Sequence, residues 1–254
     1  MSGRQCARTG LWVIEDFRYG YRIATTSWGP MNPLPRLAGD DPASWNRYDT
    51  PGSTIYLADT EEIAFAEMLS SFALKLGEVH PLQKDADFLG LSLEEYMAEL
   101  AGEWDGQQNM QPGFLPRHWR DRRLLYRLGL QAPGWWVDVE HPDSIAAISG
   151  GIGKQLSDGA GLERLTLGVL HGENRTATTL IATWLRSLTL DDETEPVGIR
   201  FRSKHGGGYS WAYWLRRADT GLTGDPMTAD DGTTIESNRP SLLAVTSRFN
   251  IKIW

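Results

Sequence analysis

One short segment constrains the fold more than any other, because it places a strand directly before a helix. Residues 54–58 read TIYLA, a run of β-branched, aromatic and aliphatic side chains that follows a Pro-Gly turn. Asp59 and Thr60 then offer N-cap oxygens, and good helix formers continue as far as Gly77, a natural residue to end a helix. The sequence therefore predicts a strand over 54–58 and a helix that begins after Thr60 and ends near Gly77.

The rest of the chain mixes strands and helices in the same way. A capping box at Ser92 predicts a helix that ends near Gly102, and the stretch from there to Gly113 is predicted to be a loop, because it is rich in glycine and amides. Further elements are predicted as a helix at 116–129, a strand at 135–139, helices at 142–156 and 176–188, a strand at 197–203, and extended segments at 211–215 and 244–254.

Length and composition bound the architecture. The 254 residues are enough for one large domain or two modest ones, and a hydrophobic content of 41% excludes a mainly disordered chain. No linker rich in proline or serine separates two cores, and no internal repeat is found. We therefore expect one α+β domain over residues 1–254, with a helical insertion at about 78–134.

The charge balance excludes several classes of function. With 25 basic and 33 acidic side chains the net charge is −8, so direct nucleic-acid binding is not expected, and the arginines at 117–127 are interpreted as part of a solvated helix. The lone Cys6 cannot form an intramolecular disulfide, and the scattered histidines lack zinc-ligand spacing, so no metal is expected. No apolar segment is long enough for a leader or a membrane span, which predicts a cytoplasmic protein without membrane contact.

Two motif look-alikes are set aside. Residues 150–155, GGIGKQ, lack the first glycine and the final Ser or Thr of a phosphate-binding loop, and are interpreted as a break in a helix. Residues 205–208, HGGG, are similar to an esterase oxyanion loop, but they overlap the serine turn at 208–212 that a hydrolase needs on a separate turn. A serine hydrolase is therefore not favoured.

Glu67 is the most informative candidate for chemistry. On a helical wheel it lies about 40° from Ile63, at the edge of the apolar face of the predicted helix. A carboxylate at this position is held against the fold, either as a functional group or as a structural group that pairs with an arginine. The residues alone leave both interpretations open.

The strand predicted at 197–203 supplies a second candidate. Its period of two places Ser203 at the end of an apolar row, directly before a Lys-His-Gly-Gly-Gly loop whose backbone N–H groups are free to face an anion. Arg22 and Arg47 precede the first predicted strand, and a guanidinium at either position can bind a pyrophosphate through two hydrogen bonds. The alternatives are a solvated hairpin and ordinary surface charges.

These residues together resemble the signature of the RES-domain family. The stretch RYDTPG at 47–52, followed by IYLAD at 55–59 and by Glu67, is similar to the family's arginine-aromatic-Asn/Asp-x-Pro-Gly turn, its tyrosine-bearing strand and its glutamate helix. The strand GIRFRS at 198–203 is similar to the family's serine-bearing strand. The chain is longer than common members, chiefly through residues 78–134, and carries aspartate in the turn where asparagine is more usual.

The resemblance implies an NAD-degrading toxin of a bacterial toxin–antitoxin pair. The implied fold is similar to that of ADP-ribosyltransferases, with a split β-sheet core flanked by helices. The implied partners are NAD, as substrate, and a helix-turn-helix antitoxin that covers the active-site cleft; the sequence leaves open whether the chain forms a homo-oligomer.

The resemblance also implies roles for individual residues. Glu67 would be the catalytic carboxylate, and Arg22 would reach the phosphates, with Arg18 and Arg47 as competitors for that role. The residues implied or proposed to bind NAD are Arg47, Tyr56, Ser203 and His205.

The chemistry fits these residues independently of the family. Nicotinamide leaves NAD as a neutral ring, so one carboxylate beside the developing cation is sufficient and no general acid is needed. Water or inorganic phosphate would then attack the ribose carbon. Two alternatives remain: a mono-ADP-ribosyltransferase that modifies a macromolecule, and a catalytically silent binding module in which Glu67 only pairs with an arginine.

Overall fold

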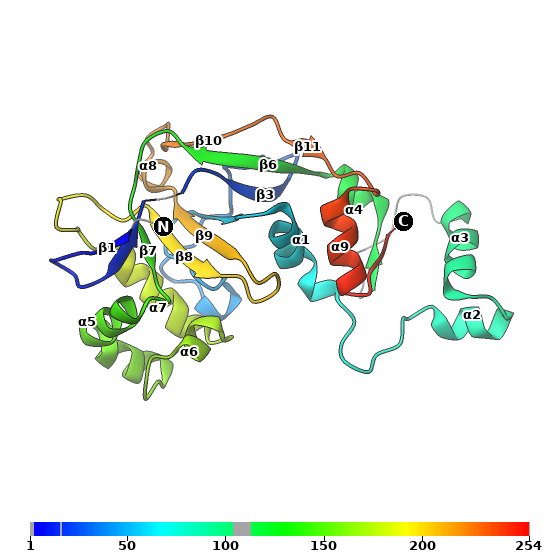
Figure 1. Ribbon diagram of the computed structural model, residues 1–254, viewed down its shortest axis with the longest axis horizontal. Coiled ribbons are helices and arrows are strands. Elements are labelled where there is room, and N and C mark those ends of the chain that lie inside the picture. Colours follow the sequence, from blue (N-terminus) through cyan, green and yellow to red (C-terminus); the bar gives the residue numbers. More distant parts are fainter. Residues whose placement is uncertain (1–2, 16, 104–112, 254) are drawn as a thin grey trace.

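The structure is a computed structural model that describes residues 3–15, 17–103 and 113–253. The sheet strands are Gly3–Gln5 (β1), Trp12–Ile14 (β2), Gly20–Thr25 (β3), Thr54–Ala58 (β4), Arg123–Leu130 (β6), Trp136–Asp138 (β7), Gly198–Arg202 (β8), Tyr209–Trp214 (β9), Met227–Ala229 (β10) and Thr233–Thr234 (β11). Among the described residues they form one sheet in the order β1-β2-β7-β8-β9-β4-β3-β6-β10, with β11 also paired to β6 (Figure 1). β7 and β8 are parallel, and the other neighbours are antiparallel.

The sheet is divided between β3 and β4. These two strands share a single registered pair, Tyr21 with Ala58, whereas β3 pairs with β6 over six positions and β4 pairs with β9 over five. Because so little backbone pairing joins the two halves, a space opens between them that side chains or a ligand can fill. The expected α+β fold, with a split sheet flanked by helices, is confirmed.

Helices cover the sheet in two groups, with a hydrophobic core under each. The flanking helices are Glu61–Leu69 (α1), Pro142–Ala160 (α5), Leu167–His171 (α6), Arg175–Arg186 (α7) and Pro240–Arg248 (α9). α5, α6 and α7 lie beside β7 and β8, where Ile181 packs in one cluster with Ile199 (Figure 1). α1 and α9 pack together near β3, around Phe65 and Leu242. Burial of these apolar side chains is the main stabilising contribution.

Several predicted elements are confirmed. The strands predicted at 54–58, 135–139 and 197–203 are β4, β7 and β8, and the extended segment at 211–215 is part of β9. The helices predicted at 142–156 and 176–188 are α5 and α7. The capping box at Ser92 begins the helix Leu93–Glu103 (α3), with Glu95 accepting hydrogen bonds from the Ser92 backbone and hydroxyl.

α1 begins as predicted and ends earlier. The Thr60 hydroxyl caps it by accepting a hydrogen bond from the Ile63 N–H at 3.2 Å. The helix ends at Leu69 and continues only as a 3-10 turn to Phe72, so the predicted end at Gly77 is wrong. Phe72 still packs on the core, whereas Leu76 is fully exposed.

The helix predicted at 116–129 is wrong. Residues Arg117–Asp121 form a short helix (α4), and the following residues form β6, which pairs with β3 along its length. Pairing with two neighbouring strands outweighs the helix propensity of the segment. Within the predicted insertion at 78–134, the described helices are therefore Gln83–Leu89 (α2), α3 and α4, whereas β6 belongs to the main sheet, and the arginines at 117–127 are not one solvated helix face. Most of the loop predicted at 102–113 lies outside the described residues.

One further expectation is corrected. The segment 244–254, expected to be extended, contributes to α9 and then to the short strand Lys252–Ile253 (β12), which pairs with Phe114–Leu115 (β5). The helix break predicted at 150–155 is confirmed as a kink within α5 at Ile152, where the backbone is not helical and φ is −131°. None of the helices that the structure describes is long and apolar enough to cross a membrane.

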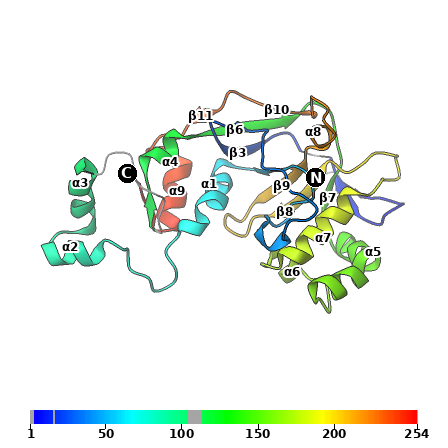
Figure 2. The ribbon, with the colours of Figure 1, turned by 180° about the vertical axis from the view of Figure 1, so that it is seen from behind.

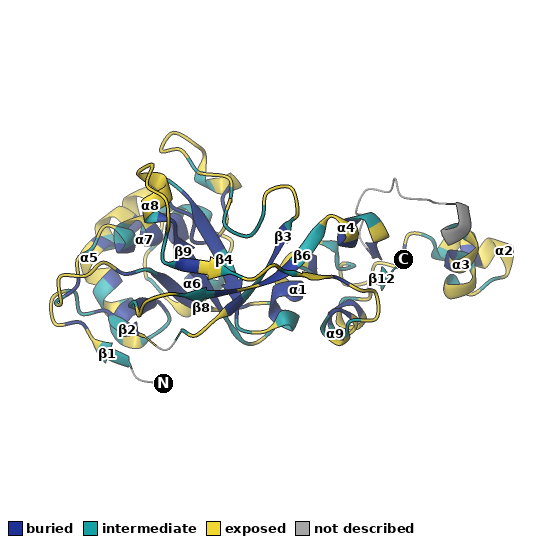
Figure 3. Ribbon diagram, turned by 90° about the horizontal axis from the view of Figure 1, so that it is seen from above, coloured by how far each residue is buried: buried dark blue, intermediate teal, exposed yellow. Residues whose placement is uncertain are grey.

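α2 and α3 form a helical hairpin that extends away from the body of the molecule. Figures 1 and 2 show it beyond α4 and α9, at the end opposite to α5 and α6. The view from above shows the same arrangement, with exposed residues over much of both helices (Figure 3). The two helices pack on each other, with Ala86 and Met97 buried between them.

Candidate active site

A pocket of about 820 Å³ opens where the sheet divides between β3 and β4. Its walls also include the loop around residues 28–36, the C-terminal half of α1 and the loop between β8 and β9. Five of the six predicted site residues line it: Arg22, Arg47, Tyr56, Glu67 and His205. The sixth, Ser203, is joined to Glu67 by a hydrogen bond. The structure therefore brings all six together, and what each does there stays a prediction.

Glu67 and Ser203 form a hydrogen-bonded pair. The Ser203 hydroxyl donates to Glu67 Oε1 at 2.6 Å, and the backbone N–H groups of His205 and Gly206 each donate to the Ser203 oxygen at 3.1 Å. These contacts use the hydroxyl hydrogen and both lone pairs, so Ser203 holds the carboxylate and is not placed as a nucleophile. The loop N–H groups expected to be free for an anion are thus partly used by Ser203.

Glu67 itself is exposed to the pocket. Its side chain lines the open space of the pocket, while Ser203 holds one carboxylate oxygen against the β8–β9 loop. No lysine or arginine among the described residues lies within ion-pair distance of it. The alternative of a structural Glu67–arginine pair therefore has no support among these residues.

Two glycines allow the β8–β9 loop to approach α1. A Cβ atom at Gly206 would lie 2.6 Å from Ile63 Cγ1, and one at Gly208 would lie 2.3 Å from Ile63 Cδ1. Ile63 is one helical turn before Glu67, so this close approach places Ser203 within reach of the carboxylate. The glycine-rich loop is therefore needed for the geometry of the pair.

Tyr56 is fixed by its hydroxyl group. The phenol donates to Asp49 Oδ1 at 2.8 Å and accepts a hydrogen bond from the Tyr48 N–H at 3.1 Å. Burial, together with the nearby Asp49 carboxylate, raises the pKa of Tyr56 well above its usual value. Asp49 is itself held by Arg36 Nε at 2.8 Å and by the Asn46 N–H at 3.0 Å. The phenol is therefore a neutral, oriented group in the pocket wall.

Arg22 and Arg47 line the pocket without carboxylate partners among the described residues. Arg22 donates only a long hydrogen bond of 3.4 Å to the Tyr56 carbonyl, its Nε atom is buried without a partner, and burial lowers its pKa to about 10. Arg47 is buried, with its guanidinium 4.6 Å above the Phe201 ring. Arg18 is exposed and does not line the pocket, so it is no longer a competitor for this site.

The pocket holds more cations than the sequence analysis identified. Its lining contains six Arg or Lys side chains and three Asp or Glu side chains, in a chain whose net charge is −8. The cations that were missed are Arg36, Arg123, Arg175 and Lys204. Lys204 and Arg175 both contact the Glu173 carboxylate, the latter at 2.7 Å. The position of Lys204 next to Ser203 was the one available signal in the sequence.

His205 is the titratable group beside Glu67. Burial lowers the pKa of His205, and the Glu67 carboxylate offsets part of this effect. The imidazole is therefore neutral near pH 7. In this form it adds no positive charge next to the carboxylate.

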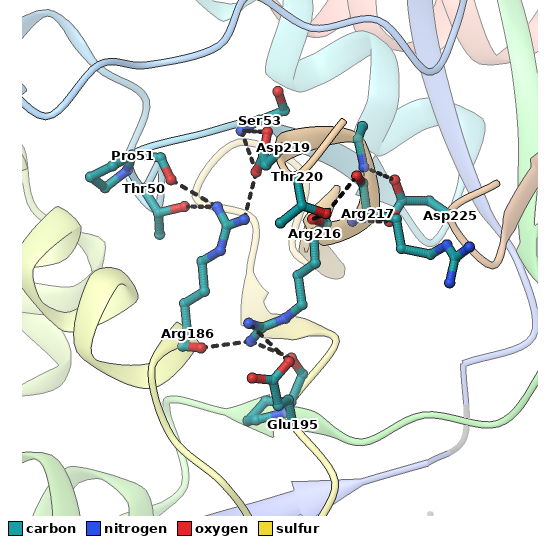
Figure 4. A network of polar contacts seen from close by, with 12 residues as sticks. Thr50, Pro51, Ser53, Arg186, Glu195, Arg216, Arg217, Asp219, Thr220 and Asp225 are labelled. Atoms are coloured by element: carbon teal, nitrogen blue, oxygen red, sulfur yellow. Dashed lines mark hydrogen bonds and ion pairs between the residues drawn. The ribbon is translucent and has the colours of Figure 1, made fainter. Parts of the chain in front are cut away.

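A network of polar contacts supports the pocket from outside (Figure 4). Arg186 donates to Thr50 Oγ1 at 2.8 Å and to Asp219 Oδ2 at 2.5 Å, and Asp219 accepts the Ser53 N–H at 2.9 Å. Gly52 has a φ of +101°, and a Cβ atom there would lie 2.3 Å from Asp219 Oδ2. The glycine of the Pro-Gly turn is therefore required for the network, which fixes the entry into β4.

The arrangement suits an anionic ligand with a planar part. Guanidinium groups without carboxylate partners favour phosphate oxygens, and aromatic side chains such as Tyr56 and Trp28 offer faces for ring stacking. Over the part of the chain that the structure describes, no group of three or more metal-ligating side chains is close enough to hold a metal ion. That the protein needs no metal stays a prediction.

The comparisons with known proteins give one similar fold. No protein-family model matches the chain, and no curated protein matches it. A chain in the crystal structure of the M.tuberculosis MbcT-MbcA toxin-antitoxin complex is similar, with a TM-score of 0.40 and 12% identity over 94% of this chain and 91% of that chain. The function of this α+β protein is therefore inferred from the side chains of its own pocket.

Proposed function

We propose that the protein binds NAD in this pocket and cleaves the bond between nicotinamide and ribose. The observation that carries the proposal is the combination of one oriented, exposed carboxylate, Glu67, with two arginines, Arg22 and Arg47, that have no carboxylate partner among the described residues. A dinucleotide supplies the phosphates for the arginines and a cationic ring for the carboxylate. The sequence resemblance to the RES-domain family points to the same substrate.

The reaction needs little from the protein beyond positioning and charge. The glycosidic C–N bond breaks with its electron pair going to nicotinamide, which leaves as a neutral ring, and positive charge develops on the ribose. Glu67, held by Ser203 at 2.6 Å, stabilises that charge. Water then adds to the ribose carbon and releases a proton; inorganic phosphate would take the same place in a phosphorolysis.

Binding energy would come from the arginine and tyrosine side chains that line the pocket. Arg22 and Arg47 would bind the pyrophosphate, whose charge replaces the missing carboxylate partners. The Tyr56 ring, immobilised through Asp49, would contact the nicotinamide or the ribose. Holding the pyrophosphate together with the nicotinamide or its ribose would align the scissile bond with Glu67, which reduces the entropic part of the barrier.

Nicotinamide release from NAD tests the proposal. The pure chain is incubated with NAD with and without phosphate, and Glu67→Gln is compared with Glu62→Gln, an exposed glutamate of α1 outside the pocket. We expect Glu67→Gln to reduce the rate by about 10²- to 10³-fold, as when a preorganised charge-stabilising group is lost. Glu62→Gln should retain the wild-type rate. No release by folded wild-type protein in either buffer would contradict the proposal.

The same experiment separates the acceptors. Release that requires phosphate indicates phosphorolysis, and release without it indicates hydrolysis. Transfer of labelled ADP-ribose to protein or nucleic acid would instead support the mono-ADP-ribosyltransferase alternative. A Glu67→Gln variant that loses stability without any change in NAD turnover would instead favour the binding module, in which Glu67 has only a structural role.

The toxin role and the antitoxin partner are proposed on the sequence resemblance. A toxin that depletes NAD should stop growth when it is expressed alone, and Glu67→Gln should relieve that effect. Co-expression with the product of a neighbouring helix-turn-helix gene tests the partner, since it should restore growth and co-purify with the chain.

A further inference from the structure

The helical hairpin of α2 and α3 carries an unusual combination of charge and exposed apolar surface. Residues 76–100, here called the acidic arm, contain six Asp or Glu side chains and one lysine. Phe88 is 89% exposed and Leu89 is 54% exposed, although both lie on a helix of an otherwise well-packed protein. Exposed apolar side chains that gather on one element are typical of an interaction surface.

A second group of exposed apolar side chains lies at the pocket. Eight of the twelve large hydrophobic side chains that the structure describes as exposed fall into two groups, one on the arm and one at the pocket. The arm group is Leu76, Val79, Phe88 and Leu89, and the second group, here called the pocket rim, is Trp28, Leu34, Leu37 and Met68. Three members of the rim line the pocket, and the fourth follows Arg36. The rim therefore adds exposed apolar side chains to the cationic pocket.

The two surfaces complement each other. The arm has an excess of five negative charges, and the pocket lining has an excess of three positive charges. Both also present apolar side chains, so apolar contact and opposite charge would act together. Two arms pairing with each other would instead bring like charges together, which is unfavourable.

We propose that the acidic arm docks on the pocket of a second copy of this chain, forming a reciprocal dimer. Figures 1, 2 and 3 show the arm extending beyond α4 and α9, away from β3 and β4, which line the pocket. In a two-fold dimer, each arm can cover the partner's pocket by the same contact, as closed symmetry requires. The arm is then a regulator of the proposed site.

Dimerisation and anion binding are therefore competitive. Carboxylates of the arm would pair with Arg22 and Arg47, the cations that have no carboxylate partner among the described residues and that would otherwise bind phosphates. By linkage, a pocket ligand that binds only the open form must shift the equilibrium toward the monomer. This inference deepens the proposed function, but the dimer itself does not require that NAD is cleaved.

Sedimentation velocity of the full chain tests the arm. We expect the wild type at low salt to sediment at twice the chain mass of 28.4 kDa, and to dissociate at high salt. Phe88→Ser/Leu89→Ser should sediment as a monomer. The control Leu222→Ser/Leu243→Ser, which removes exposed leucines elsewhere, should remain dimeric. Circular dichroism verifies that each variant is folded, and Glu94→Lys/Glu99→Lys provides a second, charge-based disruption of the arm.

Inorganic pyrophosphate tests the pocket side of the contact. At an ionic strength matched with sodium chloride, pyrophosphate should dissociate the wild-type dimer, whereas chloride alone should not. Any of three results would overturn the proposal. The wild type could be a monomer at low salt, both arm variants could remain dimeric, or pyrophosphate could fail to dissociate the dimer. If the protein forms a dimer that pyrophosphate dissociates but releases no nicotinamide from NAD, only the proposed function is contradicted. If it is a monomer that cleaves NAD, only the proposed docking of the acidic arm is contradicted.

Discussion

Two groups of arginine side chains in this protein have opposite surroundings. Arg186, outside the pocket, contacts the Asp219 carboxylate at 2.5 Å, and Arg216 beside it contacts a glutamate and two backbone carbonyls (Figure 4). Arg22 and Arg47, in the pocket, donate hydrogen bonds of 3.3–3.4 Å to carbonyl oxygens and have no carboxylate partner among the described residues, and the Arg47 guanidinium also lies over the Phe201 ring. The first group has carboxylate partners within the fold, and the second has none in the part of the chain that the structure describes.

The difference separates stability from function. A buried cation without a partner costs free energy of folding, whereas one that is matched by a carboxylate and carbonyls holds segments together. The network at Arg186 joins the end of α7 to the turn before β4. The unfavourable free energy of burying the Arg22 guanidinium is offset only when a ligand brings negative charge into the pocket. Substitutions in the two groups should therefore change different measured quantities.

The largest effect on stability is expected at Arg186. Arg186→Met removes the contacts to Thr50 and Asp219 and leaves Asp219, whose side chain is 15% exposed, without its cation. Loss of one partner of such a pair should lower the free energy of unfolding by about 3–5 kcal/mol. Urea denaturation measures this, with Arg248→Met as the control because its pair with Glu62 is exposed. Equal losses of unfolding free energy in Arg186→Met and Arg248→Met would contradict a special role of Arg186 in stability.

Arg22 should show the opposite pattern. Arg22→Met removes a poorly matched guanidinium, so the free energy of unfolding should not fall. Affinity for NAD should fall by about 10- to 100-fold, because a charge-assisted hydrogen bond contributes about 1.5–3 kcal/mol. Calorimetric titration of NAD into the Glu67→Gln background measures affinity without turnover. Arg18→Met, outside the pocket, is the matched control; equal affinities in the two variants would remove Arg22 from the site.

The part of the site that was predicted from the sequence depends on local signals. The N-cap at Thr60 and the TIYLA strand fix the start of α1, and the distance along the helix then places Glu67. The period of two in β8 similarly places Ser203 after the last apolar residue. Both signals lie within a few residues of the group they position, so one sequence is sufficient to identify them.

The part that was missed depends on pairing between distant segments. The segment of β6 is predicted as a helix because a proline stands near its start and a glycine near its end, and its pairing with β3, β10 and β11 makes it a strand. That error also hid Arg123, which lines the pocket from β6. Arg175 and Arg36 reach the pocket from segments far apart in the chain. Whether a cation has a carboxylate partner is likewise decided by tertiary packing, which a single sequence does not reveal.

The smallest expected effect is on the pH dependence of stability, and it arises from His205 in the pocket. Burial lowers the pKa of His205 below its usual 6.5, so as pH falls the unfolded chain binds this proton before the folded chain does. The contribution of His205 to stability is therefore complete above pH 6.5 and is lost progressively below it. His205→Asn should therefore make the fall in unfolding free energy below pH 6.5 less steep than in the wild type. Some fall should remain, because burial also lowers the pKa of His80. Urea denaturation across this range measures the slope, and identical slopes for wild type and His205→Asn would show that the pocket does not hold the imidazole neutral.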